Sequence, residues 1–252
     1  MDGVEWSIPK GVNRSIEMRK RKRWYLNVDK KKASGGFGTV YSGSLSRWLA
    51  SKTTIFKIYV KVAVKEQDVA THEHEVKMLR QLALPKPHPN IVPLLGAYVE
   101  NDMGYLVVPM YKSSLDKWEG PCEDILMDVL RGLEHLKEKN IVHGDIKPGN
   151  ICVRQAKGLH GVIIDFGVAK KDGDDDRGGT LEYVNAYLKW NTLNSLNVES
   201  LDHRYDLFCL SVVAGEVNAS DKAECLDLKD KLLDVLLAEP LIDMENVQQL
   251  RL

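Results

Sequence analysis

The sequence predicts an α+β fold with two lobes: a small antiparallel-sheet lobe with one helix, and a larger lobe that is mostly helical. The first third of the chain contains short runs with strand periodicity separated by turn residues, whereas long runs with helical periodicity follow Met110. Of the 252 residues, 44% are apolar and 28% are charged, a composition typical of a globular chain with a large core. These observations predict two unlike lobes.

The first lobe is expected to hold five strands and one helix. The predicted strands are WYLNV, TVYSG, IYVKVAVK, HPNIVPLLGAYV and GYLVVPM, and SLSRWLASKTT is expected to be a connection between the second and the third. VATHEHEVKMLRQLAL is predicted to be a helix, because Val76, Leu79 and Leu82 recur on one face.

The second lobe is expected to be built on helices. EDILMDVLRGLEHLKEKN carries one apolar stripe from Ile125 to Leu136, DLFCLSVVAGEV is apolar almost all round, and AECLDLKDKLLDVLLA precedes Pro240. Short strands are expected at Ile151 to Val153 and Val162 to Ile164. We divide the chain into a basic N-terminal segment (1–22), a first lobe (about 23–108), a hinge (about 109–114) and a second lobe (about 115–252).

Charge and apolar content argue against two classes of partner. The formal net charge is -1, and the longest apolar stretches fall far short of the ~20 residues that span a bilayer, so we expect neither a nucleic-acid partner nor membrane insertion. The basic run from Lys10 to Lys32 is either a nuclear-import or polyanion patch or a solvated lead-in to the first strand, and we favour the lead-in. No feature predicts an oligomeric state.

The cysteines indicate a reducing compartment. The chain has four, widely spaced and without a Cys-x-x-Cys pair, a pattern that favours free thiols over a disulfide framework or a zinc site. We therefore expect a cytoplasmic or nuclear protein. The four are Cys122, Cys152, Cys209 and Cys225.

A glycine cluster joins two predicted strands of the first lobe. Glycines let backbone N–H groups approach phosphate oxygens without side-chain obstruction. Lys65 follows on the next strand as a point charge for phosphates, and Glu75 on the following helix is chosen over Glu73 as its carboxylate partner, since it lies at the edge of the inward face. The cluster is Ser34, Gly35, Gly36, Phe37 and Gly38.

The second lobe carries a polar loop, IVHGDIKPGN, after an apolar strand, and a second aspartate at another strand end. Asp145 is suited to orient a hydroxyl and accept its proton, and Lys147 to neutralise charge on a moving phosphoryl group. Asn150 and Asp165 offer the oxygen ligands that Mg²⁺ prefers. Together these residues predict phosphoryl transfer from a nucleotide.

In this order the motifs SGGFGTV, VAVK, HPNIV, HGDIKPGN, DFG and GT resemble the eukaryotic protein kinase superfamily over nearly the whole chain. The resemblance implies a two-lobed protein-kinase-like fold, a divergent Ser/Thr kinase with a truncated second lobe, and ATP and Mg²⁺ as cofactors. It implies that Phe166, Leu79 and His143 stack as an internal spine, and that Asp206 holds the catalytic loop. The residues implied to bind the nucleotide, besides the glycine cluster, Lys65 and Asp165, are Ala33, Val40, Ala63, Val108 as gatekeeper, Pro109, Met110 and Tyr111 as hinge, and Cys152.

Two departures from the family pattern affect regulation. Gly144 replaces the arginine that grips an activation-loop phosphate in many members, and Thr180 is the only hydroxyl residue between Val168 and Glu182. These absences agree, so we expect activity without activation-loop phosphorylation. Alternating aspartates at Asp172, Asp174 and Asp176 lack the glycine and glutamate of a calcium loop, and favour basic protein substrates if they lie beside the substrate.

Three functions remain open on the sequence. His-Gly-Asp also occurs in kinases of small molecules such as aminoglycosides or choline, and a divergent member can serve as a pseudokinase scaffold. Lys147 favours a Ser/Thr protein kinase over a small-molecule kinase, since small-molecule kinases often carry histidine there. The presence of Lys65, Asp145, Asn150 and Asp165 argues against a pseudokinase. We therefore expect Thr180 to contact Asp145 and Lys147, as it does in Ser/Thr members, and a protein with Ser or Thr as acceptor.

Overall fold

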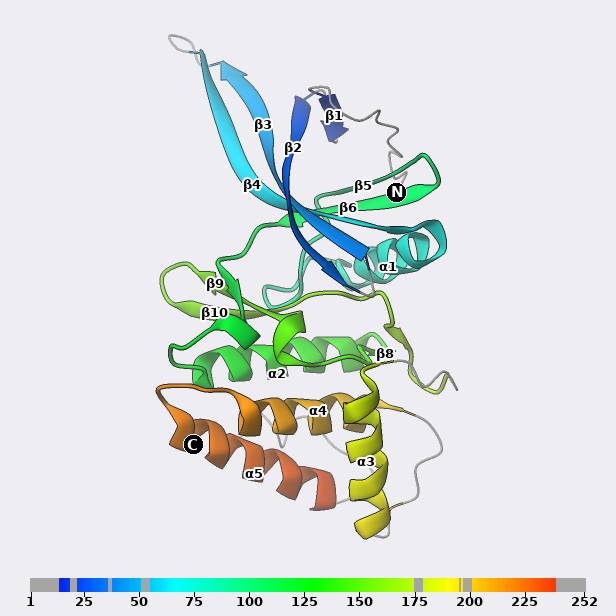
Figure 1. Cartoon of the computed structure of the whole chain (residues 1–252), viewed down its shortest axis with the longest axis vertical. Helices are drawn as coiled ribbons and strands as arrows, with labels where there is room; N and C mark the ends of the chain where they lie inside the picture. Colours follow the sequence, from blue (N-terminus) through cyan, green and yellow to red (C-terminus); the bar gives the residue numbers. More distant parts are fainter. Residues whose placement is uncertain are drawn as a thin grey trace. The chain divides into compact units, whose positions relative to one another are not determined.

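The chain separates into two compact units, each described by itself. The computed structural model describes residues 14–18, 22–35, 38–50, 55–174, 179–194, 196 and 201–238 (Figure 1). The first unit comprises Met1–Arg80 and Pro93–Met110, and the second comprises Gln81–Val92 and Tyr111–Leu252. The first is an antiparallel sheet with one helix and the second is mostly helical, so the predicted fold class is confirmed.

The first unit contains a six-stranded sheet in the order β1-β2-β3-β4-β6-β5. Helix α1 (Val69–Leu82) follows β4 directly along the chain and precedes β5. Side chains alternate along β4: Val62 and Val64 face an apolar core with Leu45, whereas Lys65 and Gln67 leave the opposite face. The strands are β1 (Arg14–Met18), β2 (Lys22–Gly35), β3 (Gly38–Ala50), β4 (Ile55–Asp68), β5 (Gly96–Glu100) and β6 (Met103–Pro109).

Five strands and a connection at SLSRWLASKTT were expected in the first lobe, and both expectations are wrong in detail. Arg14–Met18 is a strand within the predicted N-terminal segment, because it pairs with β2 from Arg14↔Leu26 to Met18↔Lys22. The predicted connection SLSRWLASKTT lies largely in strands, because β3 and β4 stay in register out to Ala50↔Ile55. Its residues 51–54 lie outside the described part of the chain, as do residues 10–13 and 19–21 of the basic run.

The stretch HPNIVPLLGAYV forms a strand only from Gly96 to Glu100. Its first part belongs to the second unit, although we assigned it to the first lobe. Val92 N–H donates to the Ile163 carbonyl (2.9 Å), Ile163 N–H donates to the Asn90 carbonyl (2.9 Å), and the Asn90 side chain donates to the Gly161 carbonyl (2.9 Å). These backbone partners, which a local pattern cannot reveal, fix the segment to the second unit.

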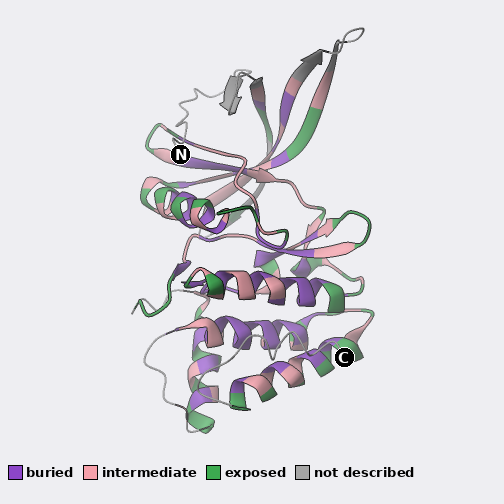
Figure 2. Ribbon diagram, turned by 180° about the vertical axis from the view of Figure 1, so that it is seen from behind, coloured by how far each residue is buried: buried purple, intermediate pink, exposed green. Residues whose placement is uncertain are grey.

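The second unit is built on four helices within the described residues, α2 (Glu123–Glu138), α3 (Leu181–Leu193), α4 (His203–Glu216) and α5 (Lys222–Ala238), with α2 and α4 buried along much of their length (Figure 2). The three helices predicted from periodicity are confirmed. Short elements hold the loops between them: β7 (Ser113–Ser114), η1 (Leu115–Lys117), β8 (Ile141–Val142), η2 (Pro148–Asn150), β9 (Ile151–Gln155), β10 (Leu159–Ile163) and β11 (Lys170–Lys171).

Helix α3 was not predicted, because the side chains it buries do not form an apolar stripe: they are Val184, Tyr187 and the polar Asn191. Aromatic packing holds it instead. The Tyr187 ring lies 5.3 Å from the ring of Tyr205 and 5.2 Å from that of Phe208, both on α4. The middle of α3 is therefore packed against α4.

Helix α2 is fixed at its start by a residue far along the chain. The Asp221 carboxylate accepts hydrogen bonds from the backbone N–H groups of Cys122 (2.8 Å) and Glu123 (2.8 Å).

Within the described ranges, no helix has the length and apolar content that crossing a membrane requires.

Candidate active site

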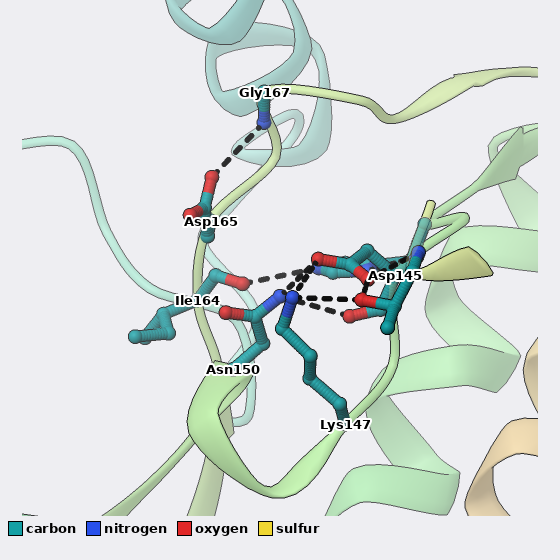
Figure 3. A network of polar contacts seen from close by, with 8 residues as sticks. Asp145, Lys147, Asn150, Ile164, Asp165 and Gly167 are labelled. Carbon is teal, nitrogen blue, oxygen red and sulfur yellow. Dashed lines mark hydrogen bonds and ion pairs between the residues drawn. The ribbon is translucent and has the colours of Figure 1, made fainter. Parts of the chain in front are cut away.

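Asp145 lies in the loop between β8 and η2 and is 4% exposed. Its Oδ1 accepts hydrogen bonds from the Thr180 backbone N–H (3.0 Å) and hydroxyl (2.5 Å). Its Oδ2 accepts from Asn150 Nδ2 (2.8 Å) and lies 2.7 Å from Lys147 Nζ (Figure 3). Four donors therefore fix the carboxylate, so that its oxygens are held in place before any substrate binds.

Thr180 contributes a hydroxyl that touches both predicted catalytic groups. Lys147 Nζ donates to Thr180 Oγ1 at 2.9 Å, while that hydroxyl donates to Asp145. The expected contact of Thr180 with Asp145 and Lys147 is present. An aliphatic hydroxyl thus fits between the carboxylate and the ammonium group.

Asp206 on α4 anchors the backbone immediately before Asp145. Its carboxylate accepts from the N–H groups of His143 (2.7 Å) and Gly144 (2.9 Å), as the family resemblance implied. Burial raises the pKa of Asp206 to about 6, although the two backbone N–H groups act in the opposite direction. The buried carboxylate therefore serves to fix the loop rather than to accept a proton from substrate.

Gly144 and Gly179 adopt backbone conformations that favour glycine, with φ of +79° and +116°. A Cβ at Gly144 would lie 3.4 Å from the nearest atom, the Val168 carbonyl oxygen, whereas a Cβ at Gly179 would lie 2.2 Å from the Gly144 carbonyl oxygen. An arginine at position 144 would therefore be strained in this backbone conformation, although its Cβ would have space. Gly179 is required for a second reason, the close packing of the GT motif on the catalytic loop.

Replacing Gly179 by alanine is expected to lower the unfolding free energy by about 2 kcal/mol or more, since it adds a backbone clash to positive-φ strain. Phosphoryl transfer should fall with it, because Thr180 follows directly. Gly173→Ala is the matched control: its φ is +88°, but no atom lies within 4 Å of the added Cβ. Denaturant unfolding of both variants separates the clash from the strain, and equal losses would contradict the packing role of Gly179.

Asn150 and Asp165 are the two residues predicted to hold a metal ion. The Asn150 amide nitrogen donates to the Asp145 carbonyl (2.9 Å) and carboxylate, which commits the nitrogen and leaves the amide oxygen pointing elsewhere (Figure 3). Asp165 has φ +63°, a left-handed conformation uncommon among residues other than glycine, and its Oδ1 accepts from Gly167 N–H (3.3 Å). A carboxylate and an amide oxygen suit a hard divalent cation that takes its other ligands from phosphate and water.

The predicted internal stack is present within the second unit. The His143 and Phe166 rings lie edge to face with centroids 4.8 Å apart, and His143 Nε2 lies 3.0 Å from the Ile164 carbonyl oxygen. Leu79, the third predicted member, lies in the first unit and is 2% exposed.

The first unit carries the predicted lysine–glutamate pair. Lys65 Nζ on β4 lies 2.9 Å from Glu75 Oε2 on α1, and the two side chains are 13% and 4% exposed. Glu75, chosen over Glu73, is therefore the partner; Glu73 is exposed. A nearly buried ion pair of this kind leaves an ammonium group with a fixed position.

Predicted nucleotide-binding residues gather on one face of the sheet. Val40 pairs with Lys65 and Ala63 pairs with Val108, so these four residues occupy neighbouring places on the same side of β3, β4 and β6. In the glycine cluster, Gly35 pairs with Gly38, Ala33 pairs with Val40, and Ser34 Oγ lies 3.2 Å from Thr39 Oγ1. Gly36 and Phe37 lie outside the described residues.

The predicted hinge residues divide between the units. Pro109 ends β6, and Met110 N–H donates to the Lys61 carbonyl (3.2 Å) in the first unit. Tyr111 begins the second unit, and Cys152 lies there on β9, paired with Ser114. Burial raises the pKa of the Cys152 thiol to about 12, so it is a neutral, largely apolar surface at neutral pH.

Sequence reasoning missed Gln67. This glutamine is 2% exposed and donates from Nε2 to Glu75 Oε2 at 2.9 Å. The available signal was its spacing, since a residue two positions beyond Lys65 on a strand faces the same side.

The comparison with known families agrees with this arrangement. The protein kinase domain family matches residues 26–223. The chain belongs to the protein kinase family. Protein kinase domains in general use ATP and a divalent metal and act on protein substrates.

Individual relatives are distant and include kinases of both acceptor classes. The serine/threonine-protein kinase STY17 of Arabidopsis thaliana is 24% identical over 202 residues, which cover 76% of this chain and 33% of the relative. The aurora kinase of Saccharomyces cerevisiae is 28% identical over 207 residues, 76% of this chain and 52% of the relative. The human receptor tyrosine-protein kinase erbB-4 is 24% identical over 225 residues, 85% of this chain and 17% of the relative. The chain thus spans about half of these relatives at most.

Proposed function

We propose that the chain transfers the γ-phosphoryl group of ATP to serine or threonine hydroxyls of a protein. The observation that carries this proposal is the Thr180 hydroxyl, which donates to Asp145 and accepts from Lys147. A substrate hydroxyl needs the same two partners, a carboxylate that orients it and takes its proton, and a cation beside the transferred phosphoryl group.

The predicted site residues receive matching roles in this proposal. Asp145 orients the acceptor hydroxyl, and Lys147 stabilises charge on the phosphoryl group in transit. Lys65, held by Glu75, binds the non-transferred phosphates. Asn150 and Asp165 would hold Mg²⁺, which neutralises phosphate charge when bound. Val40, Ala63 and Val108 offer an apolar surface for adenine.

We further propose activity without phosphorylation of the activation segment, defined here as residues 168–182. Contacts within the second unit support this. Asp172 lies 3.2 Å from His203 on α4, Asp172 N–H donates to the Asn140 carbonyl (3.0 Å), and Lys170 Nζ donates to the Asp174 carbonyl (2.8 Å). These contacts support a segment whose first part, residues 170–174, is held without a phosphate, in line with the glycine at 144. Residues 175–178 lie outside the described ranges.

We propose a preference for basic protein substrates, because three acidic side chains of this segment are exposed and would attract positive charge. They are Asp172, Asp174 and Glu182, the last of which is close to Thr180 in sequence. Asp176, the third predicted acidic residue, is not described. An increase in rate for peptides with Lys or Arg beside the acceptor, reduced at high salt, would support this preference. Equal rates for basic and acidic peptides would count against it.

The test of the acceptor class uses γ-labelled ATP with Mg²⁺ and matched peptides that differ only in Ser, Thr or Tyr as the single hydroxyl residue. A panel of small alcohols and amines accompanies the peptides. We expect label on serine and threonine. Label only on tyrosine would replace the Ser/Thr assignment, and label only in a small molecule would make the chain a small-molecule kinase.

A further inference from the structure

The side chain of Gln67 lies beside the lysine–glutamate pair of the first unit. It follows Lys65 by two positions on β4, so both side chains leave the same face of the strand. Gln67 Nε2 and Lys65 Nζ each lie 2.9 Å from the same oxygen, Oε2 of Glu75. Gln67 and Glu75 are 2% and 3% exposed, so both contacts to this oxygen are shielded from water.

The backbone around Gln67 is packed closely on two sides. A Cβ at Gly38 would lie 2.1 Å from the Glu66 carbonyl oxygen and 3.3 Å from Gln67 Cβ, so the end of the glycine cluster rests directly on this part of β4. Gln67 is paired with Gly104 on β6, and a Cβ there would lie 2.2 Å from His72 Cβ on α1. The glutamine is therefore enclosed by β3, β6 and α1, and its amide has a defined position.

We propose that Gln67 is a positioning residue that holds Glu75, and with it α1, in the place where Glu75 pairs with Lys65 before nucleotide binds. This inference rests on the proposed function and deepens it, since it supplies a reason why α1 needs no phosphorylated activation segment to stay in place. In kinases the lysine–glutamate pair must be formed for transfer, and movement of this helix is one way it is broken.

The cost of breaking the arrangement falls on buried polar groups. If Glu75 moved away, its ion pair with Lys65 would be lost, and the Gln67 amide nitrogen would lose this acceptor inside the protein. The Gln67 amide oxygen is already buried without a hydrogen-bond partner among the described residues, so it offers no compensation. A buried N–H donor that loses its charged acceptor raises the free energy of the moved state. The population of that state should therefore fall by a factor of about ten or more.

The test replaces Gln67 by methionine, which keeps an unbranched side chain of similar length and removes the donor. Gln155→Met is the matched control, because Gln155 is exposed on β9 and bonds Lys112 at the surface. We expect Gln67→Met to lower kcat/KM for ATP about tenfold and to speed amide hydrogen exchange in α1 at least about tenfold without nucleotide. ATP with Mg²⁺ should slow that exchange again, and the control should change neither quantity.

Hydrogen exchange separates this inference from the proposed function, because it needs no catalysis. Faster exchange confined to α1 would support the positioning role even in a chain that transfers no phosphate. Unchanged exchange and unchanged kcat/KM would overturn it, as would a uniform increase in exchange over the whole first unit, which marks a merely structural role.

A measurement that needs no change at Gln67 covers the case in which Gln67→Met does not fold. The side-chain amide protons of Gln67, followed by NMR, should exchange with solvent at least about tenfold more slowly than those of the exposed Gln155. Conversion of Glu75 to alanine should remove this protection. Equal exchange of the two side-chain amides would contradict the proposal.

Discussion

Replacing Asp145 by asparagine is expected to lower the rate of phosphoryl transfer by a factor of about 10² to 10⁴. The side chain keeps its size, but the amide cannot accept a proton from the acceptor hydroxyl. Both carboxylate oxygens of Asp145 accept hydrogen bonds, and the amide replaces one of them with an NH₂ group. That NH₂ group would face donors, either those of Thr180 or those of Asn150 and Lys147. The measurement is the initial rate with a serine peptide and γ-labelled ATP, together with ATP affinity.

The matched control is Asp227→Asn. Asp227 also forms an ion pair with a lysine, at 2.8 Å from Lys231, but on the exposed surface of α5. Exposed pairs contribute less than about 1 kcal/mol, so we expect no change in rate or in ATP affinity. A rate for Asp145→Asn within twofold of that control would remove Asp145 from the chemistry.

Replacing Asp206 by asparagine is expected to lower the transfer rate about tenfold to hundredfold with a much smaller effect on stability. One amide oxygen cannot replace both acceptors of the His143 and Gly144 N–H groups, so the loop that carries Asp145 loses part of its anchor. Displacements of about 1 Å at a reacting group are enough for losses of this size. The neutral amide meanwhile removes the cost of burying a charge, which offsets the lost hydrogen bond.

The pH dependence of stability gives this prediction a second readout. The folded-state pKa of Asp206 is raised to about 6, so the folded chain binds this proton more tightly than the unfolded chain. Its contribution to the unfolding free energy therefore falls as pH rises from about 4 to 6, by about 3 kcal/mol. The difference in unfolding free energy between Asp206→Asn and the unaltered chain should shift in favour of the variant over this window. A difference that does not depend on pH would contradict the raised pKa of Asp206 in the folded chain.

The fold could be predicted where local pattern and tertiary packing agree. The apolar stripe of α2 and the alternation of β4 fix those elements, and both are present. The sequence was insufficient where pairing partners are remote: Asn90–Val92 resembles a strand of the first lobe, yet its hydrogen bonds are to residues 161–163. Helix α3 was missed because aromatic contacts with α4, rather than an apolar stripe, hold it.

The candidate site could be predicted where motif residues act through their own side chains, as Asp145, Lys147 and Glu75 do. What the motifs could not supply is the environment of those side chains. The two donors to each carboxylate oxygen of Asp145, the fixed φ of Gly144 and Gly179, and the shared oxygen of Glu75 depend on distances that only the folded chain defines. Gln67 belongs to this class, since its residue type alone gives no reason to single it out.

We propose that the chain assembles a working serine or threonine kinase site without a phosphate on its activation segment. The most direct measurement is the initial rate of label transfer from γ-labelled ATP to a serine peptide, by the chain treated with phosphatase, freed of the phosphatase, and verified by mass as unphosphorylated. We expect transfer without a lag, at the rate of the untreated chain. A lag that ends as Thr180 or another residue of the chain becomes labelled, or a large loss of rate after treatment, would contradict it.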